Sequence, residues 1–364
     1  MRGRYNIEGH TAFISHQMKH YALAFLCTFF LFNGYSQLGG NSSYLLLDLP
    51  SSARVSALGG KYISVWDDDI DLAYLNPALL DSADAGQISL NYGNLFAGTR
   101  NGFASYGVDK PGIATFAATM QYLSYGEFSQ RDEFNTDLGT FSASEYVLNL
   151  GAGREIDSLF RVGANLKFVH SQLESYQSSA IAIDVAGTYR SKNKDFTIAL
   201  VLRNAGVTLT TYTEGQREKL PFAVDLGMTK RLSKSPLRFT LTLADLQKWD
   251  LSYTDPADIG RIDPLTGDEI PVEEKNVAEK ILLHVHGGME FLLGENFHLR
   301  LGYDFRRRSE LSINDIPGGS GISWGLGLKI SKFRLSYGRV IYNQSGASNH
   351  LGVAVRFSDF RKAS

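Results

Sequence analysis

The chain has 364 residues, of which 36 are basic and 38 acidic, giving a formal net charge of −2. This balance excludes the basic surface typical of nucleic-acid-binding proteins, and 43% hydrophobic residues exclude a disordered chain. With 36 glycines and 12% aromatic residues, the composition favours a β-rich fold.

Residues 1–36 have the pattern of an N-terminal extension followed by a cleaved signal peptide. The apolar run 21–32 follows a basic start at Met18, and it is shorter than the roughly 20 residues that a membrane-spanning helix needs. We predict cleavage after Ser36 and favour Met18 over Met1 as the start of the natural chain. The run contains Cys27, the only cysteine. The mature chain would therefore have no disulfide, thiol nucleophile or cysteine metal site.

The next region, 37–86, shows no alternation of apolar and polar residues. Ser51 or Ser52 predicts the N-cap of a short helix that runs through Leu58 and ends at Gly59 and Gly60. A second helical piece is expected over 72–80, interrupted at Pro77.

From residue 87 to the end, apolar residues alternate with small or polar ones. In the run 322–330, for example, Ile322, Trp324 and Leu326 share one face, and Ser323 and Gly325 share the other. Alternation of this kind predicts β-strands with one apolar face. The sequence predicts fourteen strands, near 87–94, 99–108, 112–123, 144–154, 160–170, 179–190, 195–204, 220–232, 236–246, 280–293, 296–307, 321–330, 332–342 and 348–358.

The connections between these runs alternate between short turns and longer segments, such as 124–143, 171–178, 205–219 and 247–279. Outer-membrane barrels have this asymmetry, with short periplasmic turns and longer external loops. Because lipid satisfies no backbone hydrogen bonds, such a sheet must close on itself. We therefore predict an all-β, 14-stranded antiparallel transmembrane β-barrel over 87–364 with an N-terminal plug over 37–86. A soluble β-sandwich or β-solenoid is the alternative.

Three segments carry a resemblance to a known family. LPSSARVSALGG, SVWDDDIDLAYLNPALL and QISLNYGNLFAG, in that order, resemble the PorQ-type barrels of the type IX secretion system of Bacteroidetes. The glycines Gly59 and Gly60 and the triplet that begins with Asn76 and Pro77 resemble the wider FadL-like barrels, which include PorV.

The resemblance implies an outer-membrane location and an N-terminal hatch of which Gly59, Gly60, Asn76 and Pro77 are structural parts. It also implies a role in the cell-surface attachment complex, in which the barrel anchors a PorZ-like surface protein beside PorU- and PorV-like components. It implies no covalent chemistry and no cofactor. The alternative function is that of a FadL-like passive transporter of hydrophobic molecules.

Several polar groupings are candidate sites. Asp67, Asp68, Asp69 and Asp71 have the carboxylates that calcium prefers, but they lack the spacing of an EF-hand loop. They could instead cap a helix or pair with lumen cations such as Arg300 or Arg306, which would hold the plug in place.

His284 and His286 fall on one face of a predicted strand, but two ligands without a third do not make a zinc site, so a lumen-facing position is favoured. Ser348, Asn349 and His350 are adjacent and are interpreted as loop residues rather than a catalytic set. The glycines of 318–321 lack the context of a phosphate-binding loop and predict a turn. No catalytic or metal-binding residue is predicted.

The long connection 247–279 is the candidate partner-binding loop. Loops beyond about 15 residues in compact proteins are usually functional or disordered. This one carries aromatic and proline residues suited to docking, namely Trp249, Tyr253, Pro256, Pro264 and Pro271. A mobile loop without a partner is the alternative.

Overall fold

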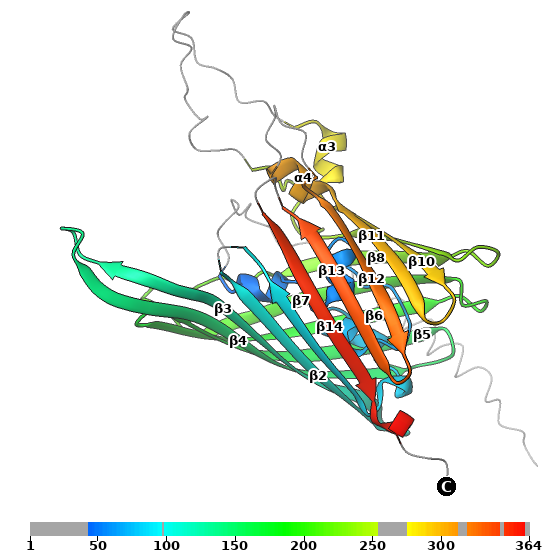
Figure 1. Ribbon diagram of the computed structural model, residues 1–364. Helices are drawn as coiled ribbons and strands as arrows, with labels where there is room; N and C mark the ends of the chain where they lie inside the picture. Colours follow the sequence, from blue (N-terminus) through cyan, green and yellow to red (C-terminus); the bar gives the residue numbers. More distant parts are fainter. Residues whose placement is uncertain (1–42, 97, 254–274, 312–318, 343–345, 361–364) are drawn as a thin grey trace, which may run out of the picture. The chain divides into compact units, whose positions relative to one another are not determined.

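The computed structural model describes residues 43–96, 98–253, 275–311, 319–342 and 346–360. These residues form a closed barrel of fourteen antiparallel strands, in which β1 pairs with β14 (Figure 1). The prediction of a closed, all-β, 14-stranded antiparallel barrel is confirmed. The strands are β1 (Gln87–Asn94), β2 (Arg100–Lys110), β3 (Ala114–Arg131), β4 (Asp137–Glu155), β5 (Phe160–Leu173), β6 (Tyr176–Arg190), β7 (Phe196–Thr210), β8 (Ala223–Arg231), β9 (Leu237–Leu243), β10 (Val285–Leu293), β11 (Phe297–Asp304), β12 (Ile322–Ile330), β13 (Phe333–Ile341) and β14 (Ala347–Arg356). The expected signal segment, with Cys27, lies outside the described residues.

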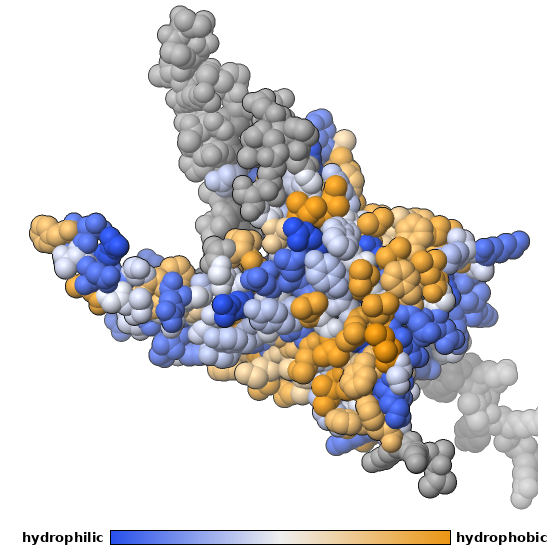
Figure 2. Space-filling view, viewed as in Figure 1, coloured by the Kyte–Doolittle hydropathy of each residue, from blue (hydrophilic) through white to orange (hydrophobic). Residues whose placement is uncertain are grey.

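Apolar side chains face outward from this barrel. On β12, Ile322 and Trp324 are exposed, whereas Ser323 and Gly325 are buried. The other strands repeat this alternation, and Figure 2 shows hydrophobic residues gathered over the barrel wall in the face drawn. An apolar outer wall around a polar interior is the surface that a lipid-embedded barrel presents. None of the helices in the described ranges is long and apolar enough to span a membrane.

The strand boundaries differ from prediction at both long hairpins. Residues 124–143, expected as a loop, are mostly the outer ends of β3 and β4, and the expected loop 171–178 shrinks to the turn between β5 and β6. Both faces of these extensions are largely exposed, so the apolar signal that marks a half-buried strand is absent there.

Two helices replace predicted strand residues. Residues 280–282 belong to α3 (Val277–Leu282) rather than to a strand, and 305–307 belong to α4 (Phe305–Leu311). A capping box between Asn276 and Glu279 begins α3, in which each side chain bonds the other residue's backbone N–H.

Residues 43–86 pack against the inner wall of the barrel with most of their side chains buried. They form α2 (Ala53–Ala57) and four 3₁₀ turns, η1 (Leu45–Asp48), η2 (Ile70–Tyr74), η3 (Pro77–Leu79) and η4 (Ser82–Asp84). The Ser52 hydroxyl accepts a hydrogen bond from the Val55 N–H, which confirms the predicted cap, and the helix ends before Gly59 and Gly60, both at positive φ. The second helical piece is two 3₁₀ turns on either side of Asn76. We call residues 43–86 the inner segment.

Helix α2 lies across the seam where the barrel closes. It contacts β12, β13 and β14 on one side of the seam and β1 on the other. The Ala53 N–H donates to Asn91 Oδ1 of β1 at 3.2 Å, while the Ala53 carbonyl lies against Gly338 of β13. One short helix therefore connects the first and last strands.

Glycines on the inner wall let the backbone of the inner segment approach closely. A Cβ on Gly163 of β5 would lie 2.3 Å from the Pro77 carbonyl carbon, and a Cβ on Gly338 would lie 2.2 Å from the Ala53 carbonyl oxygen. Real Cβ atoms do not come this close to backbone atoms. Other inward glycines in the same situation are Gly107, Gly153 and Gly302. Part of the high glycine content is therefore explained by contact with the inner segment.

Replacing Gly163 by valine should displace Pro77 and lower the free energy of unfolding by about 1–3 kcal/mol, the usual cost of overpacking. The matched control is Gly187→Val on the neighbouring strand, because a Cβ there meets no atom within 4 Å. Urea unfolding midpoints of the two variants in detergent would test this, and equal midpoints would contradict the close contact.

Candidate functional site

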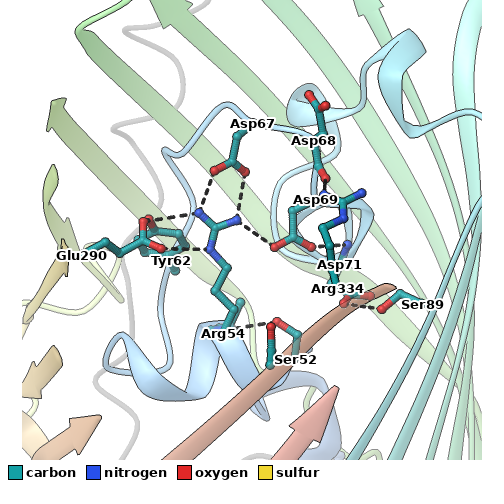
Figure 3. Close-up of polar contacts among 12 residues, drawn as sticks. Ser52, Arg54, Tyr62, Asp67, Asp68, Asp69, Asp71, Ser89, Glu290 and Arg334 are labelled. Carbon is teal, nitrogen blue, oxygen red and sulfur yellow. Dashed lines mark hydrogen bonds and ion pairs between the residues drawn. The ribbon is translucent and has the colours of Figure 1, made fainter. Parts of the chain in front are cut away.

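The inner segment and the barrel wall meet at an ionic cluster around Arg54, a residue of α2 (Figure 3). Its guanidinium donates to Asp67 at 2.7 and 2.9 Å and to Asp69 at 2.8 Å, both in the loop that follows α2. It also donates to Glu290 of β10 at 3.2 and 3.3 Å. Arg54 thus ties its own loop to the barrel wall.

Glu290 is the wall residue on which the cluster converges, and its side chain is only 1% exposed. Besides Arg54, it accepts hydrogen bonds from Arg238 of β9 at 2.7 Å and from Arg300 of β11 at 3.2 Å. The Tyr62 hydroxyl of the inner segment also donates to it. A carboxylate buried this deeply is stable only when it is paired and hydrogen-bonded, and here three guanidiniums meet that need.

Asp67 is held ionised by two of these arginines. Burial alone would raise its pKa, but the guanidiniums of Arg54 and Arg238 lower that pKa well below its ordinary value. Burial alone would lower the pKa of Arg54, but the carboxylates of Asp67 and Glu290 raise that pKa above its ordinary value. Asp67 and Arg54 are therefore both charged at neutral pH.

Asp71 is in a different environment, because no cation among the described residues forms an ion pair with it. Its carboxylate accepts hydrogen bonds from Ser89 Oγ at 2.6 Å and Asn91 Nδ2 at 2.8 Å, and its second oxygen has no partner among the described residues. Burial first, and then the charge of Asp69, raise the pKa of Asp71 to about 7. This group releases its proton near neutral pH.

A cavity of about 530 Å³ lies beside the cluster, between the inner segment and β11–β14. Its lining includes Asp68 and Asp69 of the inner segment and, from the opposite wall, His298, Lys329 and Arg334. Arg334 donates to the Asp68 backbone carbonyl, and Arg356 bonds the Asp68 carboxylate at 3.4 Å. Many of the lining side chains are charged, and the cavity lies toward the end of the barrel that carries the short turns 294–296 and 331–332.

Buried ion pairs also occur on the wall formed by β5–β8. Lys167 lies 2.7 Å from Asp184, and Arg203 lies 2.7 Å from Asp225, with all four side chains fully buried. Arg203 also reaches Asp48 of the inner segment at 3.3 Å. A second set of charges therefore holds the inner segment on this side.

The plug residues of the family resemblance lie at these contacts. Asn76 is fully buried and donates to the Ile63 carbonyl at 2.7 Å and to Thr188 Oγ1 of β6 at 3.0 Å. Pro77 lies against Gly163, and the Gly59 N–H donates to Ser323 Oγ of β12 at 3.1 Å. Gly60 follows Gly59 in the turn after α2.

The acidic run does face lumen cations, but not the two arginines proposed from the sequence. Arg300 pairs with Glu290, and Arg306 pairs with Asp245 and Glu310. The partners of the run are instead Arg54, Arg238, Arg334 and Arg356. Neither of the two arginines named as examples forms an ion pair with the run among the described residues, because strand register decides which inward arginine lies level with it. Within the described ranges, no three His, Cys, Asp or Glu side chains gather as a metal site would require.

The histidine and serine candidates are buried parts of the wall. His284 precedes β10 and bonds the Ala244 carbonyl at 2.7 Å, and His286 bonds the Gly59 carbonyl at 3.2 Å. Ser348 and His350 are hydrogen-bonded at 2.9 Å, but they lie on β14 with Asn349, so the interpretation of these residues as a loop was wrong. Asn349 points to the opposite face and accepts from Tyr337 and Arg339. In the glycine-rich segment, Gly321 has a φ of +87° and precedes β12.

The candidate partner loop is described only in part. Trp249 and Tyr253 are 62% and 57% exposed, as a docking role requires. Pro256, Pro264 and Pro271 lie outside the described residues. Partner binding by these five residues stays a prediction.

No protein-family model matches the sequence, and no curated protein matches it. Similar solved structures are FadL-type outer-membrane barrels. They include the toluene transporter TodX of Pseudomonas putida, with 13% identity over 84% of this chain and 96% of that one and a TM-score of 0.48. A FadL homologue of Pseudomonas aeruginosa has 11% identity over 84% and 98%, with a TM-score of 0.47. The monoaromatic hydrocarbon channel CymD has 12% identity over 84% and 96%, with a TM-score of 0.46. Likeness at this level concerns barrel form and carries no conclusion about activity.

The sequence did not reveal Glu290 as the centre of the cluster. One signal was present in the sequence. Glu290 stands between the apolar residues Met289 and Phe291 in a predicted strand, so the alternation places its side chain on the lumen face. What the sequence lacked was the register that brings Arg238, Glu290 and Arg300 to one level on β9, β10 and β11.

Replacing Glu290 by glutamine should leave three arginines facing a neutral group. Removing one partner of a buried pair costs about 3–5 kcal/mol, so we expect a loss of that size in the free energy of unfolding. Glu310→Gln, which breaks a half-exposed pair with Arg306, should cost about 0–1 kcal/mol. Chemical unfolding in detergent distinguishes the two, and equal losses would contradict the central role of Glu290.

Asp71 gives a pH prediction. Its folded-state pKa of about 7 lies above the ordinary value of 3.8, so the folded protein binds the extra proton between these values. Stability should therefore fall as pH rises from about 4 to about 7, and Asp71→Asn should reduce this fall. Unfolding midpoints at several pH values check the slope. An unchanged slope in the variant would mean that Asp71 is not the group that titrates.

Proposed function

We propose that the protein is an integral outer-membrane barrel whose lumen is filled by its own inner segment, and that it acts as an anchor for a surface partner. The outward apolar wall supports the membrane location. By the asymmetry of its connections, the end that carries 211–222, 244–284 and 305–321 faces the cell exterior.

The observation that carries the anchor role is the ionic cluster at Arg54 and Glu290. The inner segment is bound to the wall by buried charges, and many charged side chains line the cavity beside it. A carrier of hydrophobic molecules needs an apolar path, whereas an anchor needs only a rigid barrel and loops that reach a partner. In this proposal the partner is a PorZ-like surface protein of the type IX attachment complex, together with PorU- and PorV-like components.

A second candidate is passive transport of hydrophobic molecules; among the similar structures, TodX is named a toluene transporter and CymD a monoaromatic hydrocarbon channel. One feature of the wall favours it. The β6–β7 ladder is interrupted between Ile183 and Val185, and Asn204 opposite has a φ of +56°. A carrier that releases its ligand sideways into the bilayer needs such a break in a wall. Here the break is filled by a hydrogen bond of 2.7 Å from the Asn204 N–H to Asp184.

Gentle detergent extraction from native outer membranes, followed by affinity purification and mass spectrometry, separates the two candidates. For an anchor, we expect one surface protein to co-purify in stoichiometric amount and to be shed from cells that lack the barrel. An unrelated tagged barrel from the same cells is the control. Recovery of the barrel alone, with bound lipid or fatty acid, would overturn the anchor proposal in favour of transport.

A further inference from the structure

The hairpin of β3 and β4 extends beyond the strands on either side of it (Figure 1). Pairing of β3 with β2 ends at Ser124, and pairing of β4 with β5 ends at Ala143. Residues 127–142 continue as a two-stranded ribbon, which we call the arm. A two-stranded ribbon is marginally stable by itself, since it lacks a third strand and a covered face.

A bulge at the base of the arm reverses its faces. Ser124 pairs with Ser144 and Glu127 with Ser142, so Tyr125 and Gly126 together oppose Ala143. Gly126 has a φ of +88°, a conformation that glycine adopts without strain. Before the bulge the even-numbered side chains of β3 point out of the barrel, and after it they point to the side that continues the lumen face.

The reversal turns Phe128 of β3 to the inward-facing side of the arm, where Phe141 of β4 already lies. Phe128 pairs with Phe141, and their rings stack with centroids 5.3 Å apart. Phe128 is 42% exposed, and Phe134 in the turn is 80% exposed. An aromatic pair above the barrel mouth, without a packed core around it, is a typical binding surface.

The arm also offers a backbone edge and a distinct charge. Away from β4, no described strand pairs with residues 127–131, whereas Glu174 bonds the Ser142 carbonyl on the other side. Unpaired edges accept an added strand from another chain. The charged residues of the arm are Glu127, Arg131, Asp132, Glu133 and Asp137, so acidic groups outnumber basic ones four to one.

We infer that the arm is a docking surface for a basic β-strand of the surface partner, which pairs with the free edge of β3 and packs on Phe128 and Phe141. The inference rests on the proposed anchor function, and it moves the main contact from the connection 247–279 to the β3–β4 hairpin. Acidic charge on the arm selects a strand with lysine or arginine side chains.

The test compares variants of the tagged full-length protein in the co-purification described above. In one variant, residues 128–141 are replaced by Asn-Gly, which joins the paired residues Glu127 and Ser142 and leaves the bulge and barrel intact. In a second, Phe128→Ser and Phe141→Ser remove the aromatic pair. In a third, Glu127→Lys and Glu133→Lys reverse two charges. The control is Tyr176→Ser, which removes an exposed aromatic from the neighbouring β5–β6 hairpin.

We expect each arm variant to lose partner recovery by roughly tenfold or more, as hot-spot residues do, while the control retains it. Recovery with the unaltered barrel should also fall as salt increases. Heat-modifiable migration on gels confirms that every variant forms a barrel. Equal recovery by all variants would overturn the arm as the docking surface and leave the anchor function standing. Absence of any partner with the unaltered barrel would instead overturn the anchor function.

Discussion

A carboxylate removed from water needs cations or hydrogen-bond donors beside it. Because Glu290 is buried, the residues that surround it have to supply them. Arg238 and Arg300 on the neighbouring strands would alone leave the wall with excess positive charge. Arg54 adds a third guanidinium and brings the carboxylates of its own loop, so that three positive and three negative side chains balance. The inner segment therefore supplies charges that the barrel wall needs to balance its own. Without the inner segment, two arginines would face one glutamate at this level of the wall.

The opposite wall holds the inner segment by shape as well as by charge. Around Pro77 the strands carry glycines, and the backbones approach to distances that no side chain would permit. Asn76 adds hydrogen bonds but no charge. Ion pairs from Arg203 to Asp48 and from Arg161 to Asp81 also hold the inner segment on this wall. Both sides of the junction therefore combine buried charge with close backbone packing.

The barrel could be predicted from the sequence because apolar and polar residues alternate wherever a strand has one apolar face, as at Ile322, Trp324 and Leu326. It failed on the β3–β4 extension, where both faces meet solvent and alternation carries no information. It also failed to pair the acidic run with its true partners. The run and its arginines were visible, but the level of Arg238 and Arg334 in the lumen depends on strand tilt and register, which no local pattern records. The capping of α2 by Ser52 was predictable since it depends on neighbouring residues alone.

The place of α2 across the β1–β14 seam has a consequence for how the barrel assembles. Those two strands are the most distant in the chain, so their pairing is the contact with the largest loss of chain entropy and is expected late in folding. A helix that bonds Asn91 on one side and lies against Gly338 on the other can make its full set of contacts only once both edges are present. Ring closure and docking of α2 are therefore expected to occur together. An assembly intermediate with an open seam would have α2 undocked, and this difference in structure would distinguish unfinished barrels from finished ones.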